Sequence, residues 1–314
     1  MSTESRRGFL SKVGLALAGV GVLVLPRRAQ ASYAEDRQSH NGGRLTLTTA
    51  VPVTVADVTS GTLFWAPYKS SLISLISNGK VVTLASAEVS ISLTSISTTA
   101  PTDVFGFFNA GVLALELLVW TNDTTRATGL TAPSTTVPFY FKAGDSTRRY
   151  LGTVYGSAAN TVADTEANRY VWNVNNRVAK RTVTSDATAS WTHAVNSFAA
   201  MNSGAAAWRV DFVRGQDEDP IDFSASCTNQ KATGGAASVA VGLDSTTAVS
   251  ADCTCGIPVP GSNPGTFAPA HYLGNPGIGK HFLSALQGSD DASTATYYGT
   301  VARRQEGVTC LIVC

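Results

Sequence analysis

Charged residues are scarce in this chain. They make up 14% of its 314 residues, well below the quarter or so that is usual in globular proteins. Methionine occurs only twice, and no cysteine precedes position 227. Coiled coils and helical repeats need many charged and helix-forming residues, so this composition excludes them. The formal net charge of +1 also disfavours a nucleic-acid-binding protein.

Serine, threonine and glycine take the place of the missing charges. Glycine alone contributes 28 residues, and 44% of the chain is hydrophobic. Enough apolar material is therefore present for a folded core, which argues against disorder. A chain rich in Thr, Ser and Gly favours strands and turns over helices.

Short alternating segments separated by turn residues run through most of the chain. Hairpins are expected around Asn78-Gly79 and around Asn109-Ala110-Gly111, because apolar runs flank each turn. Strands of this length, spaced by about 8 to 12 residues, predict an all-β, antiparallel sandwich of the jelly-roll type. Only residues 158–168 suggest a turn or two of helix. We place one β domain at 32–182 and a second at 183–314, although one extended sandwich also fits.

The first 31 residues have the layout of an export signal of the twin-arginine type. A basic stretch is followed by a 13-residue apolar run, Val13 to Leu25, and by a small-x-small triplet. That run is short for a helix that spans a membrane. A retained anchor or an unprocessed tail are the alternatives. Cleavage would change the net charge from +1 to −3. The residues that define the signal are Arg6, Arg7, Phe9, Leu10, Ala29 and Ala31.

All cysteines lie in the last 90 residues, and their number is odd. We expect disulfides that leave at least one thiol unpaired or paired between chains. Free buried thiols and a metal site are the alternatives, but His271 and His281 do not have the spacing of metal ligands. The five residues are Cys227, Cys253, Cys255, Cys310 and Cys314.

Three motifs suggest chemistry, and each is incomplete. Gly274 to Lys280 fits G-x-x-x-x-G-K, but His281 follows where a phosphate loop needs Ser or Thr. Ser146 follows Gly144-Asp145 as in some ester hydrolases, yet no His has an Asp three residues before it. The acidic turn Asp217 to Asp222 matches no calcium loop. We therefore expect no catalytic residue, no metal and no cofactor, and four structural histidines.

Several blocks, taken together and in order, resemble a family of tailed-phage and prophage virion proteins of the tail-fibre or structural kind. The longest block is Leu115 to Thr128, with the sequence LELLVWTNDTTRAT. The other blocks are Gly43–Leu47, Asp103–Phe105, Thr147–Thr153, Arg169–Asn173, Asn176–Val178, Gly242–Thr247 and Pro276–Gly279. The resemblance implies a β-rich particle component without catalytic residues.

The expected function is therefore a non-enzymatic virion protein, a tail- or head-fibre-like component that binds neighbouring subunits and host surface glycans. The alternative is a bacterial exported surface or envelope protein in the periplasm, on the cell surface or secreted. The scarcity of charges predicts a homo-oligomer, with a trimer favoured. Some aromatic side chains would then lie between chains, among Phe105, Phe107, Phe108, Trp120, Phe139 and Phe141.

Two further expectations concern individual residues. Four charged residues at predicted strand ends should be structural, because guanidinium groups bind the carboxylates and carbonyls that turns leave over. They are Asp123, Arg126, Arg148 and Arg149. Ligand recognition is expected on the loops of the C-terminal half, above all Gly256 to Gly279.

Overall fold

The computed structural model describes residues 39–231, 235–255, 266–301 and 304–314. Nearly all regular structure in these ranges is strand, which confirms the expected all-β sandwich-like fold. The described helical turns are two short 3-10 segments, η1 (Met201–Gly204) and η2 (Ala206–Trp208). The residues of the export-like signal and part of the loop 256–279 lie outside the described residues.

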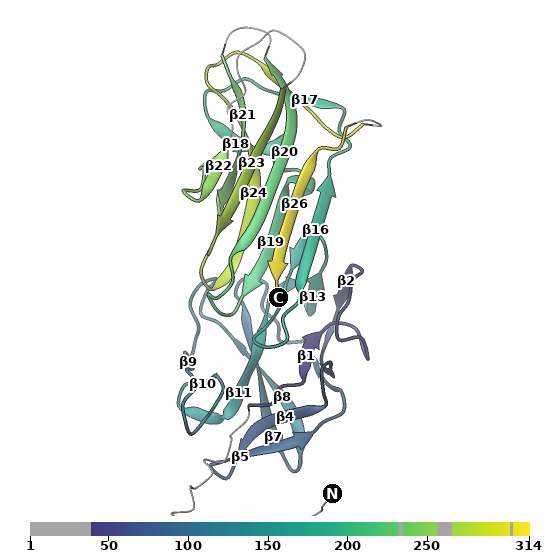
Figure 1. The fold of residues 1–314 in the computed structure, drawn as a ribbon, viewed down its shortest axis with the longest axis vertical. Coiled ribbons are helices and arrows are strands. Elements are labelled where there is room, and N and C mark those ends of the chain that lie inside the picture. The colour runs from purple at the N-terminus through teal and green to yellow at the C-terminus, as the bar shows by residue number, and fades with distance from the viewer. Residues whose placement is uncertain (1–38, 232–234, 256–265, 302–303) are drawn as a thin grey trace, which may run out of the picture. The chain divides into compact units, whose positions relative to one another are not determined.

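Two large sheets dominate the second half of the chain (Figure 1). The eight-stranded sheet has the order β12 (Gly156–Ala158), β13 (Thr161–Asp164), β14 (Asn168–Arg169), β19 (Arg209–Arg214), β24 (Gly279–Ser289), β18 (Phe198–Ala200). Two further strands join it: β2 (Val58–Ser60) pairs with β13, and β21 (Ala237–Leu243) pairs with β24. The seven-stranded sheet has the order β16 (Ala179–Ser185), β26 (Gly307–Val313), β20 (Ile221–Lys231), β23 (Thr266–Gly274), β22 (Cys253–Cys255), with β25 (Ala295–Tyr298) on β20 and β17 (Ser190–His193) on β25.

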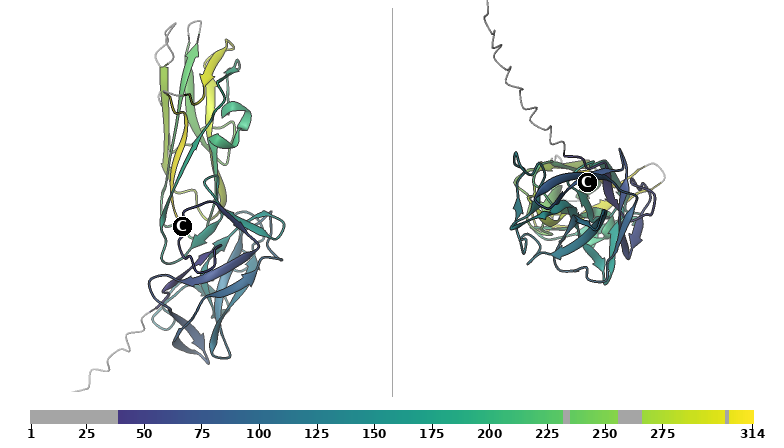
Figure 2. Two further views of the ribbon diagram at one scale, coloured as in Figure 1. Left: turned by 90° about the vertical axis from the view of Figure 1, so that its right-hand side faces the viewer. Right: turned by 90° about the horizontal axis from the view of Figure 1, so that it is seen from below.

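Three smaller sheets contain most of the first half. The six-stranded sheet has the order β8 (Val112–Val119), β7 (Thr102–Asn109), β11 (Asp145–Val154), β10 (Phe141–Lys142), β9 (Leu130–Thr131), with β15 (Val171–Asn173) on β11. The second is a three-stranded sheet with the order β1 (Gly43–Thr46), β3 (Thr62–Pro67), β6 (Val89–Ser92). The third is the two-stranded hairpin of β4 (Leu72–Ser77) and β5 (Lys80–Ala85). Figure 2 shows these purple and blue strands gathered apart from the long green ones.

Both predicted hairpins are confirmed. Asn78 and Gly79 have φ of 50° and 72°, and Ala110 and Gly111 have φ of 48° and 97°. Positive φ at both central residues gives the turn type whose twist matches that of paired strands. These turns set the register of β4 with β5 and of β7 with β8.

The expectation of helical turns at 158–168 is wrong. That segment contains the end of β12, all of β13 and the start of β14. Asn160 turns the chain with φ of 62°, and Val162 and Ala163 are then buried at 0% and 4% exposure. Pairing with β2 and β12 on both edges decides the conformation, because tertiary contacts override weak local preference.

Strands from both sides of the predicted boundary at 182/183 share one sheet. β14 pairs with β19 in parallel, whereas the other strand pairs are antiparallel. β16, which spans the boundary itself, pairs along its full length with β26. Positions 38–314 form one compact unit, and a division into two folding units stays a prediction.

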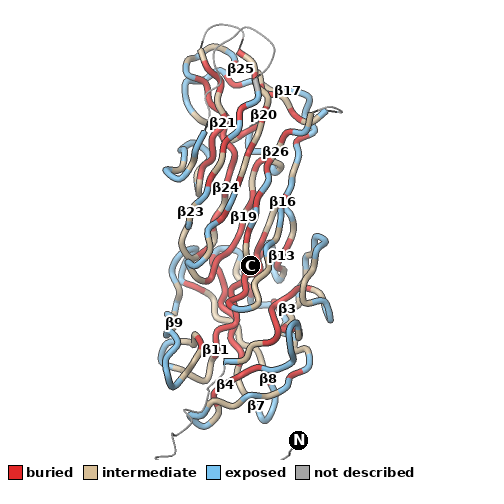
Figure 3. The backbone as a smooth tube through the Cα atoms, in the orientation of Figure 1, coloured by how far each residue is buried: buried red, intermediate tan, exposed pale blue. Residues whose placement is uncertain are grey.

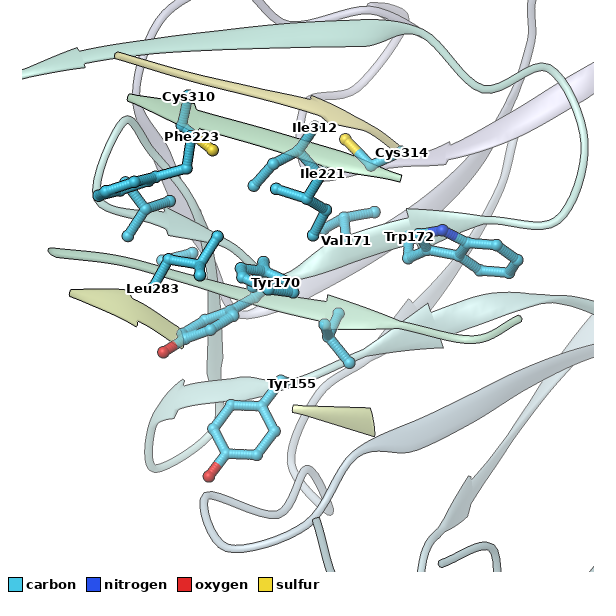
Figure 4. Close-up of a cluster of buried hydrophobic side chains, with 14 of the residues drawn as sticks. Tyr155, Tyr170, Val171, Trp172, Ile221, Phe223, Leu283, Cys310, Ile312 and Cys314 are labelled. Carbon is cyan, nitrogen blue, oxygen red and sulfur yellow. The ribbon is translucent and has the colours of Figure 1, made fainter. Parts of the chain in front are cut away.

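The core lies between the sheets. Alternate residues of β20 are buried, and buried segments follow β19 and β24 in Figure 3. Figure 4 shows part of this core, where Tyr170, Phe223 and Leu283 come from three different strands or their ends. Three of the six aromatic residues considered for contacts between chains, Phe105, Trp120 and Phe139, are buried within the chain at 5% exposure or less. These three are therefore not available for such a contact, and the predicted oligomer stays a prediction.

Candidate functional site

A buried ion pair joins β7 to the loop after β8. Arg126 Nε donates to Asp103 Oδ2 at 2.7 Å, and the two side chains are 9% and 1% exposed. Thr153 Oγ1 also donates to Asp103, at 2.7 Å. Arg126 Nη2 reaches the carbonyl oxygen of Gly215 at 2.6 Å. The pair therefore connects the six-stranded sheet with the loop between β19 and β20.

The surroundings of this pair are aromatic and dry. The Arg126 guanidinium lies 4.4 Å from the ring centroid of Trp120 and 5.4 Å from that of Tyr150. Burial raises the pKa of Asp103, and the charge of Arg126 with its hydrogen bond opposes that rise. Because the polar groups of Asp103, Arg126 and Thr153 already bind within the cluster, the cluster fixes the segments that carry them. It offers no group to a substrate.

Other blocks of the sequence meet around similar close contacts. Leu45 N donates to Asn173 Oδ1 at 2.6 Å, and Asn176 Nδ2 donates to the carbonyl oxygen of Gly43 at 2.9 Å. Gly279 approaches the loop after β8 so closely that a Cβ there would lie 2.2 Å from the carbonyl oxygen of Asp123. Segments far apart in the sequence are thus held together by side-chain amides and a glycine contact.

Arg149 is the most unusual charged residue. It is 1% exposed, and its Nη1 donates to the carbonyl oxygens of His40 at 2.5 Å and Ser74 at 2.7 Å. Its Nη2 donates to Ser39 Oγ at 3.0 Å. Within the described ranges it has no carboxylate partner. Burial lowers the pKa of this guanidinium to about 9, as expected for a desolvated cation.

The two remaining residues expected to be structural, Arg148 and Asp123, make different kinds of contact. Arg148 Nε donates to Glu116 Oε2 at 2.5 Å, and its guanidinium lies 4.1 Å from the Phe107 ring centroid. The Asp123 side chain is exposed, whereas its backbone carbonyl accepts from Lys280 N at 2.9 Å. The contact of Asp123 is therefore made by its backbone.

The five cysteines are free thiols in the structure, so the expected disulfides are not formed. Cys310 pairs in register with Phe223, four residues before Cys227, which separates the two by roughly 13 Å along the strands. β22 lies beyond β23 from β20, so Cys253 and Cys255 are also remote from β26. A disulfide requires Cα atoms within about 7 Å. The odd number of cysteines and their closeness in the sequence did not reveal the register in which their strands pair.

The candidate nucleophile and the histidines do not converge. Ser146 lies in β11, and none of the described hydrogen bonds of the histidine rings involves it. His281 Nδ1 lies 2.7 Å from Asp244 Oδ2, and His271 Nε2 lies 3.0 Å from Asp222 Oδ1. In the part of the chain that the structure describes, no Ser or Cys side chain hydrogen-bonds to a histidine ring.

The two other motifs are held by ion pairs. Lys280, the lysine of G-x-x-x-x-G-K, lies 2.7 Å from Asp211. In the acidic turn, Arg177 binds Glu218 at 2.7 Å and Asp219 at 2.5 Å. Among the described residues no cluster of three metal-ligating side chains occurs. Arg177 thus already occupies oxygens of Glu218 and Asp219 that a cation would otherwise use.

The cavities on the described surface include two that differ in size. The larger, about 240 Å³, is lined by residues that include Ser39, Phe139, Tyr140, Asn175, Arg177 and Glu218. The smaller, about 180 Å³, lies where β16, β20 and β26 meet and includes Glu306 and several hydroxyl groups. Sequence reasoning missed both, because each collects side chains from segments separated by dozens of residues.

No protein-family model matches the chain, and neither does any curated protein. Among the described residues, no helix is long and apolar enough to cross a membrane.

Proposed function

We propose that this protein is a non-enzymatic structural component of a tailed-phage or prophage particle, of the tail- or head-fibre kind. The observation that carries the proposal is the meeting of the phage-like sequence blocks in one buried framework. Asp103, Arg126 and Thr153 belong to three of these blocks and bind one another. A buried framework of this kind suits a protein whose role is structural.

The outer face of the seven-stranded sheet is the surface that we assign to neighbouring subunits. Apolar side chains on it include Phe267, Leu273 and Leu311, which are 58%, 54% and 44% exposed. Exposed apolar groups that share one sheet face are typical of an interaction surface. A homotrimer remains the favoured assembly for a fibre component.

The alternative is a bacterial exported surface or envelope protein built on the same sandwich. The paired Arg6 and Arg7 before Phe9 and Leu10, with the Ala29-x-Ala31 triplet, favour it. The two functions differ in where the protein is found and in what becomes of its first 31 residues.

Mass spectrometry of purified particles separates the two. In a strain that carries the gene, prophage induction should yield particles that contain the protein in stoichiometric amounts, with peptides that start at Met1 or Ser2. Absence from particles, together with a periplasmic or surface protein that starts near Ser32, would establish the alternative.

A further inference from the structure

We propose that the larger cavity, lined by Ser39, Tyr140 and Arg177, binds a single sugar unit that carries a carboxylate. This inference rests on the proposed function, because it names the class of glycan that such a component recognises. The cavity measures about 240 Å³, below the range of roughly 300 to 1,000 Å³ that is usual for drug-sized ligands. A monosaccharide unit is therefore the appropriate size of ligand.

Part of the cavity lining is apolar and aromatic. Phe139, Tyr140, Pro133 and Pro138 contribute to it, and Phe139 is held in place by the guanidinium of Arg149, 4.4 Å from its ring centroid. Aromatic rings and prolines offer flat apolar surface at little entropic cost, which suits the C–H face of a sugar ring.

A buried positive charge that has no carboxylate partner among the described residues lies next to that part of the lining. Arg149 contacts two of the lining residues, Phe139 through the ring and Ser39 through a 3.0 Å hydrogen bond to Oγ. Its Nε is buried and has no hydrogen-bond partner among the described residues. Because no described carboxylate balances this charge, an anion in the cavity would gain more from it than a neutral ligand.

Two polar residues of the lining, Ser39 and Asn175, offer donors to a ligand. Ser39 Oγ accepts from Arg149, so its own proton remains for a ligand. Asn175 Oδ1 accepts from Asn41 at 3.2 Å, which leaves its N–H groups as donors. Donors beside a buried cation match the oxygens of a carboxylate.

Glu218 supplies an acceptor to the lining. Its side chain is 39% exposed and uses one oxygen for Arg177, at 2.7 Å. Its other oxygen can accept from sugar hydroxyls. Arg177, which also pairs with Asp219, offsets part of the charge of Glu218 and so weakens its repulsion of a bound carboxylate. The lining thus offers both donors and an acceptor.

D-glucuronate and D-glucose test the proposal, because they differ only by a carboxylate in place of a hydroxymethyl group. Titration of the full chain, followed by ligand-observed NMR, should show glucuronate binding at least tenfold more tightly than glucose. Tyr140→Ala should weaken glucuronate binding by tenfold or more. Ser39→Ala should reduce the preference for glucuronate over glucose. Tyr68→Ala, which truncates an exposed tyrosine outside this cavity, is the matched control.

Thermal melting of each variant confirms that it is folded. Equal affinity for the two sugars, no binding of either, or glucuronate binding that Tyr140→Ala leaves unchanged would overturn the proposal. The particle measurement is independent: a protein that is absent from particles but binds glucuronate through Tyr140 keeps this site and loses the proposed virion role. A particle protein that binds neither sugar gives the opposite result.

Discussion

Arg126 donates a 2.6 Å hydrogen bond to the carbonyl oxygen of Gly215, 89 residues further along the chain. The same guanidinium is paired with Asp103. One largely buried side chain thus joins the first half of the chain to the loop that precedes β20. Such contacts fix distant segments of the chain relative to one another, as the proposed structural role requires.

Arg126→Ala should strongly destabilise the fold. The substitution leaves the buried Asp103 carboxylate without its cation, and breaking a buried pair in this way costs about 3 to 5 kcal/mol of unfolding free energy. Urea unfolding followed by tryptophan fluorescence measures it. Arg209→Ala is the control, because the Arg209 side chain is 34% exposed in its pair with Asp211 and such pairs contribute about 1 kcal/mol or less. Similar losses for both variants would contradict the structural role of Arg126.

Thiol reactivity should separate the five cysteines. Burial raises the pKa of Cys227 and of Cys310 to about 12, so neither forms thiolate at pH 8. Cys255 is exposed and should react first with Ellman's reagent. We expect one rapid equivalent in the native protein and five in urea, with the rapid one removed by Cys255→Ser. Fewer than five equivalents in unreduced, denatured protein would reveal a disulfide.

The strands could be predicted from the sequence because their signals are local. Alternation and the Asn78-Gly79 turn determine a hairpin without reference to the rest of the chain. The parallel pairing of β14 with β19 could not be predicted, because Asn168 pairs with Asp211, 43 residues away, and no local pattern encodes that contact. Disulfide bonds could not be predicted for the same reason, because they depend on the register between strands.

The cavity that we propose as a sugar site could not be predicted for a related reason. Its lining combines Tyr140, Arg177 and Glu218, each of which looks like an ordinary surface residue in its own segment. Arg149 was assigned a structural role from its place at a strand end, but the absence of a carboxylate partner became visible only through its three-dimensional surroundings.

Acid should weaken the fold partly through Glu116. Burial raises the pKa of this carboxyl, but hydrogen bonds from Arg148 and Lys142 outweigh burial and hold the pKa below its ordinary value. A carboxyl with a lowered folded-state pKa contributes stability above its unfolded pKa, near 4.3, and loses it as pH falls through the folded value. Glu116→Gln should therefore flatten the decline of melting temperature below about pH 4.5. An identical pH profile for wild type and variant would contradict this.

The contact of Gly279 with Asp123 should tolerate no side chain. Gly279 has φ of +127°, and a Cβ built there would lie 2.2 Å from the Asp123 carbonyl oxygen and 3.1 Å from Thr124 Cα. Both are backbone atoms, so the clash cannot be relieved by a rotamer change. The adjacent Lys280 N also donates to the Asp123 carbonyl at 2.9 Å. Gly279→Ala should therefore separate the loop after β8 from the start of β24 and lower the unfolding free energy by at least about 2 kcal/mol.

Gly129→Ala is the matched control for this substitution. A Cβ at Gly129 meets no atom within 4 Å, and alanine restricts the unfolded chain more than glycine does. Its unfolding free energy should equal or slightly exceed that of the wild type. Chemical denaturation of both variants under one set of conditions gives the comparison. If Gly279→Ala is as stable as Gly129→Ala, the two segments that meet at Gly279 and Asp123 are not held together by this close approach.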